Sequence, residues 1–214
     1  MVSTWVDRKL YSFKMLNMTS AENSEKNEGV RYTEQEMDGA ALCLKSTDKD
    51  IVLSPLFQST WEDTNFVGLM RNGYALCEAW MRRGKQPDYV GRFYRWFGER
   101  MIADNERYPK YIIVRFEDLI RDPFGVGEQL YGFADLEPTT LPKLRFKSKR
   151  VMDEEGDHET RFGEENAKYW FDRETVFELI DPTVSDNQIS KLSASDRAAF
   201  EAEALPVLKH FGYA

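Results

Sequence analysis

The chain has 214 residues, of which 42% are hydrophobic and 14% aromatic, and this is enough apolar material for one substantial globular core. Its 37 acidic and 29 basic residues give a formal charge of −8, so broad electrostatic attraction to nucleic acid is not expected, and a bound anion requires a local basic site. The apolar stretches are far shorter than the roughly 20 residues that cross a bilayer, and residues 1–14 lack an apolar secretory core, so we expect a cytoplasmic protein with no membrane partner.

The two cysteines and two histidines are too few and too scattered to indicate a disulfide framework or a zinc site. We therefore expect Cys43 and Cys77 to be buried as small apolar side chains. No metal is predicted from these residue types.

The first 44 residues are expected to form a polar, partly flexible segment ahead of a single α/β domain at residues 45–214. The stretch Thr19–Asp38 is the basis of this division, because its few apolar residues are isolated among Asn, Ser, Gly and Glu. Such a stretch buries little surface of its own.

A strand, a turn and a helix are predicted in succession between Phe66 and Gly84. The continuous apolar run Phe66–Met70 is typical of a strand buried on both faces of a parallel sheet. Arg-Asn-Gly follows as a turn, and Tyr74–Arg83 contains good helix formers before the terminating glycine.

A second strand and its helices follow along the chain. Apolar residues recur every three or four positions over Val90–Tyr108, which predicts an amphipathic helix. Tyr111–Phe116 repeats the apolar strand pattern, and Asp122 followed by proline marks the start of another helix. Two such units predict a mainly parallel sheet flanked by helices, whose ligands bind beyond the carboxyl ends of the strands.

The remainder of the chain is predicted as a long charged loop and a terminal helix. Residues Pro138–Arg173 show no clear periodicity, and a loop of that length is usually functional or disordered. Ser193 caps a final helix that ends at Gly212.

Arg71 is the leading candidate for a binding residue. It follows a predicted buried strand and precedes a helix, where a guanidinium and the free backbone N–H groups attract phosphate or sulfate. The alternative is an arginine that caps a neighbouring helix or pairs with a surface carboxylate.

Two further groups of charged residues could carry chemistry. Glu117 and Asp118 follow the second strand, where a carboxylate can hold a metal ion or act as a general base. In the alternative that we favour, Asp118 accepts hydrogen bonds from the free N–H groups of the next turn. A basic cluster could close over a multiply charged anion, or form a solvated face that a neighbouring acidic run neutralises. The cluster comprises Lys143, Arg145, Lys147, Lys149 and Arg150.

The order of these motifs resembles the carboxyl-terminal two-thirds of a sulfotransferase. FVGLMRNGYALCEAWMRRG is followed by YIIVRFEDLIRDP, a basic loop and a terminal helix ending in HFGYA. The resemblance covers roughly residues 45–214 and implies a P-loop-like α/β fold. It also implies transfer of a sulfuryl group from 3′-phosphoadenylyl sulfate to a hydroxyl or amine, leaving adenosine 3′,5′-bisphosphate. Arg71 would then bind the 3′-phosphate of the donor, with Lys147, Lys149 and Arg150 closing over the same phosphate. The catalytic base and the acceptor, a small molecule, glycan or protein, are left unassigned, and Glu117 and Asp118 would be structural.

The sequence departs from the sulfotransferase pattern at three places. Ala79 stands where the family often has a serine that also binds the 3′-phosphate, and Gly73 stands where proline is common. The first strand-loop-helix unit, whose loop binds the 5′-phosphosulfate, is not found in residues 1–44. The departures leave open a fragment, half of a split protein with a complementing N-terminal partner, or a homologue that binds a nucleotide or partner without catalysis. They also make self-association more favourable, because a flank of the sheet would be uncovered. A magnesium-dependent phosphotransferase with Asp118 as metal ligand is a third hypothesis, but no Walker-type lysine is suitably placed.

Overall fold

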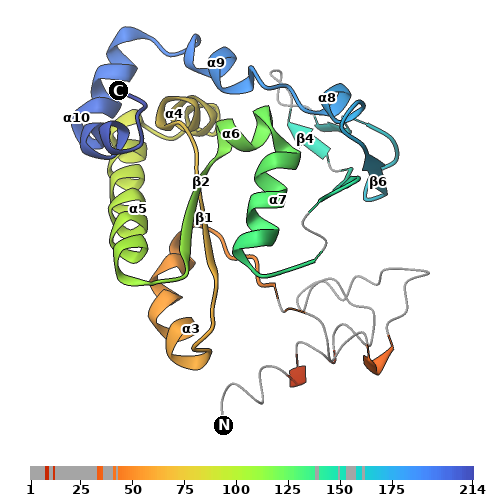
Figure 1. The fold of residues 1–214 in the computed structure, drawn as a ribbon. Helices are drawn as coiled ribbons and strands as arrows, with labels where there is room; N and C mark the ends of the chain where they lie inside the picture. The colour runs from red at the N-terminus through yellow and green to blue at the C-terminus, as the bar shows by residue number, and fades with distance from the viewer. Residues whose placement is uncertain are drawn as a thin grey trace. The chain divides into compact units, whose positions relative to one another are not determined.

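The computed structural model describes residues 8–9, 12, 33–35, 41, 43–137, 140–148, 150–152, 158–160 and 162–214. The chain divides into two compact units, Met1–Thr64 and Asn65–Ala214. In the first unit, a 3₁₀ helix η1 (Asp48–Leu53) leads directly into a short helix α3 (Ser54–Thr60) (Figure 1). Of the predicted flexible segment Thr19–Asp38, only residues 33–35 are described, so that prediction lies almost entirely outside the described residues.

The second unit contains the predicted strand-and-helix succession. Its elements are β1 (Phe66–Met70), α4 (Gly73–Met81), α5 (Pro87–Arg107), β2 (Tyr111–Arg115), α6 (Phe116–Arg121), α7 (Pro123–Phe133), β3 (Leu144–Lys147), β4 (Arg150–Met152), β5 (His158–Thr160), β6 (Lys168–Phe171), α8 (Val176–Leu179), α9 (Val184–Ile189) and α10 (Ala194–His210). The α/β class is confirmed. The two predicted caps are also confirmed, because the Asp122 side chain accepts from the Gly125 N–H and the Ser193 side chain accepts from the Asp196 N–H.

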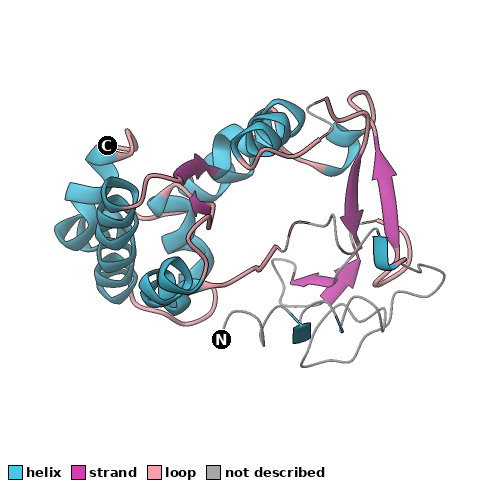
Figure 2. Ribbon diagram, turned by 60° about the horizontal axis from the view of Figure 1, so that its bottom comes forward, coloured by secondary structure: helices cyan, strands magenta, loops and turns pink. Residues whose placement is uncertain are grey.

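The strands occur in pairs, as Figure 2 shows. β1 and β2 are parallel, with Phe66 opposite Tyr111 and Met70 opposite Arg115. The other pairs in the described part of the chain, β3 with β6 and β4 with β5, are antiparallel. The predicted parallel arrangement is therefore present for the two strands that precede α4 and α6, and their carboxyl ends lie at the same edge.

The predicted burial of β1 on both faces is wrong. Side chains on the face that carries Gly68 and Met70 are covered, and a side chain at Gly68 would overlap Met101 of α5. Val67 and Leu69 point to the other face and are 52% and 50% exposed. The physical reason is that a strand gains burial on both faces only where other elements cover both of them.

The main core lies between α4, α5 and α10, which contact one another (Figure 1). Phe200 of α10 is fully buried and its ring lies 5.7 Å from the rings of both Tyr74 and Tyr94. Gly98 allows α5 to approach α10 closely, because a Cβ at this position would overlap the Val207 side chain. The terminal helix is thereby fixed against the two helices that follow β1.

Residues 138–173 are not a continuous loop as predicted. Leu144 and Phe146 on β3 alternate with charged residues, and this period-two pattern matches a strand that is buried on one side only. The buried side packs into a second, smaller core formed by Phe124, Leu141 and Val176. The strands were missed because they are only three or four residues long.

The two cysteines have different environments. Cys77 on α4 is completely buried, as predicted, whereas the prediction of a buried Cys43 is wrong because that side chain is exposed. Burial raises the pKa of the Cys77 thiol to about 11.

The Cys43→Ser variant, which leaves Cys77 as the only thiol, should be unreactive toward an aromatic disulfide reagent at about pH 8 while it is folded, because the thiolate is the attacking species. Unfolding in concentrated guanidinium chloride should release the full thiol signal. Absorbance at both stages measures the difference, and rapid reaction of the folded variant would contradict it.

Gly98→Ala should lower the free energy of unfolding by about 1–3 kcal/mol, because the added methyl group overpacks the contact with Val207. Gly132→Ala is the matched control. This glycine also lies in a helix, but it has open space around it, so alanine should stabilise the protein by about 0.5–1 kcal/mol. Urea denaturation measures both effects, and equal effects would contradict the close approach of α5 and α10.

Candidate functional site

Arg71 lies at the carboxyl end of β1, where the chain turns into α4. Its guanidinium lies over the Phe116 ring, with Cζ 4.7 Å from the ring centroid, and donates a hydrogen bond to the side-chain oxygen of Gln188 on α9. The Nε atom is buried and has no hydrogen-bond partner among the described residues. Burial lowers the pKa of the guanidinium, although the negative charges of Glu117 and Glu78 partly offset this effect.

The predicted alternative roles of Arg71 do not describe these contacts. Its hydrogen bond to Gln188 goes to a neutral side-chain amide in the last turn of α9, and not to a carboxylate or to a helix carbonyl. Its backbone is fixed as well, since its carbonyl accepts a 3.1 Å hydrogen bond from the buried Tyr94 hydroxyl. The side chain is thus held in place, and no described carboxylate forms a direct ion pair with it.

The turn after Arg71 is tied to α6 through Asn72. The Asn72 side chain caps α4 by accepting a 3.0 Å hydrogen bond from the Tyr74 N–H. Its own backbone N–H donates a 3.0 Å hydrogen bond to the Glu117 carboxylate. The first turn of α6 therefore supplies an acceptor to the turn that leads into α4.

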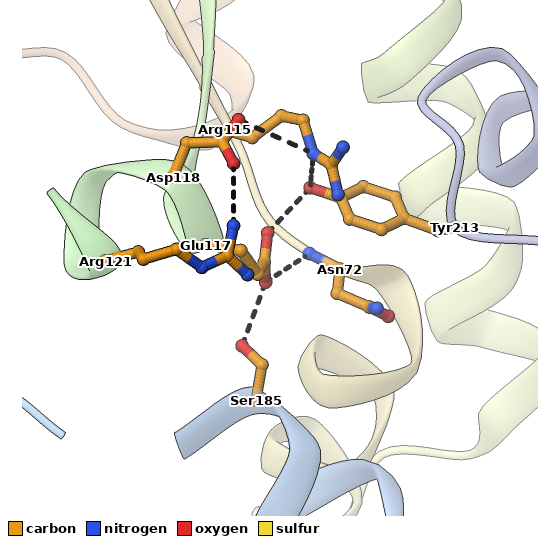
Figure 3. Close-up of polar contacts among 7 residues, drawn as sticks. All are labelled: Asn72, Arg115, Glu117, Asp118, Arg121, Ser185 and Tyr213. Atoms are coloured by element: carbon orange, nitrogen blue, oxygen red, sulfur yellow. Dashed lines mark hydrogen bonds and ion pairs between the residues drawn. The ribbon is translucent and has the colours of Figure 1, made fainter. Parts of the chain in front are cut away.

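Glu117 accepts two further hydrogen bonds (Figure 3). The Ser185 hydroxyl donates to the same oxygen as the Asn72 N–H, at 2.9 Å, and the Tyr213 hydroxyl donates to the other oxygen at 2.7 Å. Ser185 is 3% exposed. Burial, and then the hydrogen bond to Glu117, raise the pKa of the Tyr213 phenol, so it remains a donor at neutral pH. One carboxylate thus connects the β1–α4 turn, α9 and the end of the chain.

Tyr213 is positioned by the way in which α10 ends. Gly212 adopts a left-handed conformation, with φ of 71°. Its N–H donates to the Lys209 carbonyl, and the Tyr213 N–H donates to the Leu208 carbonyl at 2.8 Å, which is a Schellman motif. The Tyr213 ring then lies under the Arg115 guanidinium, 4.6 Å from its centroid to Cζ, and its hydroxyl accepts a 3.4 Å hydrogen bond from Arg115 Nε.

Asp118 does not have the role that was expected from the sequence. Its carboxylate lies 3.4 Å from Arg121 and 3.9 Å from Arg115, and it is half-exposed. The backbone N–H of a turn is bonded by its neighbour, Glu117, instead. Within the described ranges no group of three or more His, Cys, Asp or Glu side chains could hold a metal ion, so those residues provide no site for the metal-ligand hypothesis.

Two of the remaining predicted binding residues, Lys147 and Arg150, belong to antiparallel strand pairs. Lys147 lies on β3 opposite Lys168, Arg150 begins β4, and Lys149 lies outside the described residues. Of Arg150 only the backbone is described. The observed partners of the Arg71 side chain come from α6 and α9, so the closure of this basic cluster over a phosphate stays a prediction.

Sequence reasoning missed the residues that surround Arg71. Gln188 is separated from it by 117 residues, and Tyr213 is separated from Glu117 by 96 residues. No local pattern pairs residues so far apart. The available signal was the glycine after the terminal helix, which fixes the direction of the residue that follows it.

Comparisons with known proteins do not identify a family. No protein-family model matches the chain, and no match was found among the curated proteins or the solved structures. In the part of the chain that the structure describes, no helix has both the length and the apolar character needed to span a membrane.

Tyr213→Phe should reduce the free energy of unfolding by about 1.5–3 kcal/mol, because it removes a hydrogen bond to a charged group. Tyr89→Phe is the control, since Tyr89 is 45% exposed near the start of α5 and its ring lies beside Lys85, so its effect should stay within about 0.5 kcal/mol. Denaturant unfolding measures both variants. Equal stabilities of the two variants would contradict the bond between Tyr213 and Glu117.

Proposed function

We propose that the chain binds the sulfate-donor nucleotide of the sulfotransferases through Arg71, which would contact the 3′-phosphate. One observation carries this proposal. The Arg71 guanidinium is fixed at the carboxyl end of a parallel strand, and its buried Nε has no hydrogen-bond partner in the part of the chain that the structure describes. Unpaired buried donors are rare, and an anionic ligand would supply the missing acceptor. The carboxyl end of a parallel strand is also where α/β proteins commonly bind their ligands.

The contacts of Arg71 favour an anion over a neutral ligand. Gln188 is uncharged, so its hydrogen bond orients the guanidinium and leaves the positive charge for a ligand. The Phe116 ring covers one face of the guanidinium, and a planar guanidinium bound on its face still presents N–H donors along its edges. This geometry suits phosphate or sulfate oxygens.

The finer activity that we propose is transfer of a sulfuryl group from 3′-phosphoadenylyl sulfate to a hydroxyl or amine. In that reaction the acceptor oxygen or nitrogen forms a bond to sulfur, the bond from sulfur to the phosphate oxygen breaks, and the acceptor proton passes to a base. Arg71 would hold the nucleotide end of the donor. Donors to the departing oxygen would also be needed, since loss of one such donor costs about 2.7–4 kcal/mol in barrier height.

A second candidate is nucleotide binding without transfer. The observation that favours it is that residues 1–44 do not contain the loop that would bind the 5′-phosphosulfate and stabilise charge on the leaving oxygen. Binding of adenosine 3′,5′-bisphosphate without turnover of the sulfated nucleotide would support this candidate over the enzyme.

Calorimetric titration with adenosine 3′,5′-bisphosphate tests the proposal. Arg71→Ala should weaken binding by about 1.5–3 kcal/mol, or roughly ten- to hundredfold, because it removes a charge-assisted hydrogen bond. Arg121→Ala is the matched control: its side chain is 72% exposed and pairs with Asp118, so the affinity should not change. No binding by the folded wild-type chain, or equal binding by Arg71→Ala, would overturn the proposed function.

A further inference from the structure

The groups around Glu117 have the composition of an anion-binding site. The hydrogen bonds that the carboxylate accepts from described residues all come from uncharged donors, the Asn72 N–H and the hydroxyls of Ser185 and Tyr213. Figure 3 shows these donors converging on the carboxylate from separate parts of the chain. Backbone N–H and hydroxyl groups that converge in this way are also used by proteins to bind phosphate and sulfate oxygens.

We propose that the Asn72 N–H, Ser185 and Tyr213 form an anion-binding site that Glu117 fills from within the same chain, and that an anionic ligand at Arg71 competes with this carboxylate. The proposal rests on the proposed function, because it concerns how the Arg71 site is regulated. Its ligand class is a phosphate, sulfate or carboxylate group. Competition at this site sets how tightly such a group can bind.

The Arg71 guanidinium contacts the two helices that carry Glu117 and Ser185. It lies over the ring of Phe116, the residue before Glu117 on α6. It also donates a hydrogen bond to Gln188 on α9, the helix that supplies Ser185 to the carboxylate. Glu117 also acts on Arg71 electrostatically, because its negative charge opposes the lowering of the Arg71 pKa by burial. An arriving anion therefore either displaces Glu117 from its donors or binds against its charge.

The position of Tyr213 extends this competition to the end of the chain. Tyr213 donates to Glu117 and is held in turn by Arg115 and by the Schellman motif after α10. Displacement of the carboxylate would leave the Tyr213 hydroxyl without that acceptor. Ligand binding at the β1–α4 turn is thus linked to the ordering of the last residues.

Glu117→Gln tests the proposal, because glutamine keeps the shape of the side chain and removes its charge. Calorimetric titration with adenosine 3′,5′-bisphosphate should show binding roughly tenfold tighter than in the wild type, since a neutral acceptor is displaced more easily and does not repel the ligand. Asp118→Asn is the matched control. It removes the same charge from the next residue, which contacts arginines rather than the turn, and should change the affinity by less than about twofold.

A second experiment tests the site without the nucleotide. Glu117→Ala removes the carboxylate and leaves the three donors, so sodium acetate should raise its thermal unfolding midpoint, whereas sodium chloride at equal ionic strength should not. The wild type should show no such difference between the two salts. If the alanine variant does not fold, the titration of the glutamine variant decides the question.

The outcomes separate this inference from the proposed function. Tighter binding by Glu117→Gln, with no such change in Asp118→Asn, supports competition. Unchanged affinity in Glu117→Gln overturns the inference, and the proposed function then still holds if Arg71→Ala loses affinity. Absence of nucleotide binding in every folded variant overturns the proposed function. In that case, stabilisation of Glu117→Ala by acetate supports the anion site, and equal responses to acetate and chloride overturn it.

Discussion

The Glu117 carboxylate is the acceptor on which the arrangement of the site depends. Its three donors come from the β1–α4 turn, from α9 and from the residue that follows Gly212. Ser185 is almost completely buried, so its hydroxyl would be costly to leave unpaired. The carboxylate therefore connects parts of the chain that are far apart in the sequence.

The packing of the helices determines where these donors lie. Gly98 and the aromatic contacts of Phe200 fix α10 against α5 and α4, and the left-handed Gly212 then turns the chain so that Tyr213 meets Arg115 and Glu117. The same packing positions Arg71, because α9 carries both Ser185, which donates to Glu117, and Gln188, which accepts from Arg71. The positions of the site residues consequently depend on the packing of the helical core.

The local elements of this fold were predictable where a strong pattern is written in neighbouring residues. The apolar run at Phe66–Met70, the periodicity of α5 and the caps at Asp122 and Ser193 each led to the correct element. The four short strands between Leu144 and Phe171 were missed because three or four residues give little periodicity. The exposure of one face of β1 was also missed, since an apolar run does not reveal which faces are covered.

The candidate site was predictable only in part, for a related physical reason. Arg71 was identified because the strand and the turn beside it are local features. The sequence favoured Asp118 as the carboxylate that bonds the turn, and the resemblance alone gave Glu117 a structural role. The donors to Glu117 could not be foreseen, because tertiary packing brings them together. The residue type shows that a carboxylate could accept hydrogen bonds here, but long-range contacts decide whether Glu117 or Asp118 does so.

The most direct test of the account is the backbone amide signal of Asn72, followed by ¹H–¹⁵N NMR as adenosine 3′,5′-bisphosphate is added to the wild-type chain. This signal should move as the ligand binds, because the amide exchanges the Glu117 carboxylate for a ligand oxygen. In Arg71→Ala the signal should not move. Saturable binding that leaves the Asn72 amide unchanged would contradict the account, because the ligand would then bind away from the β1–α4 turn.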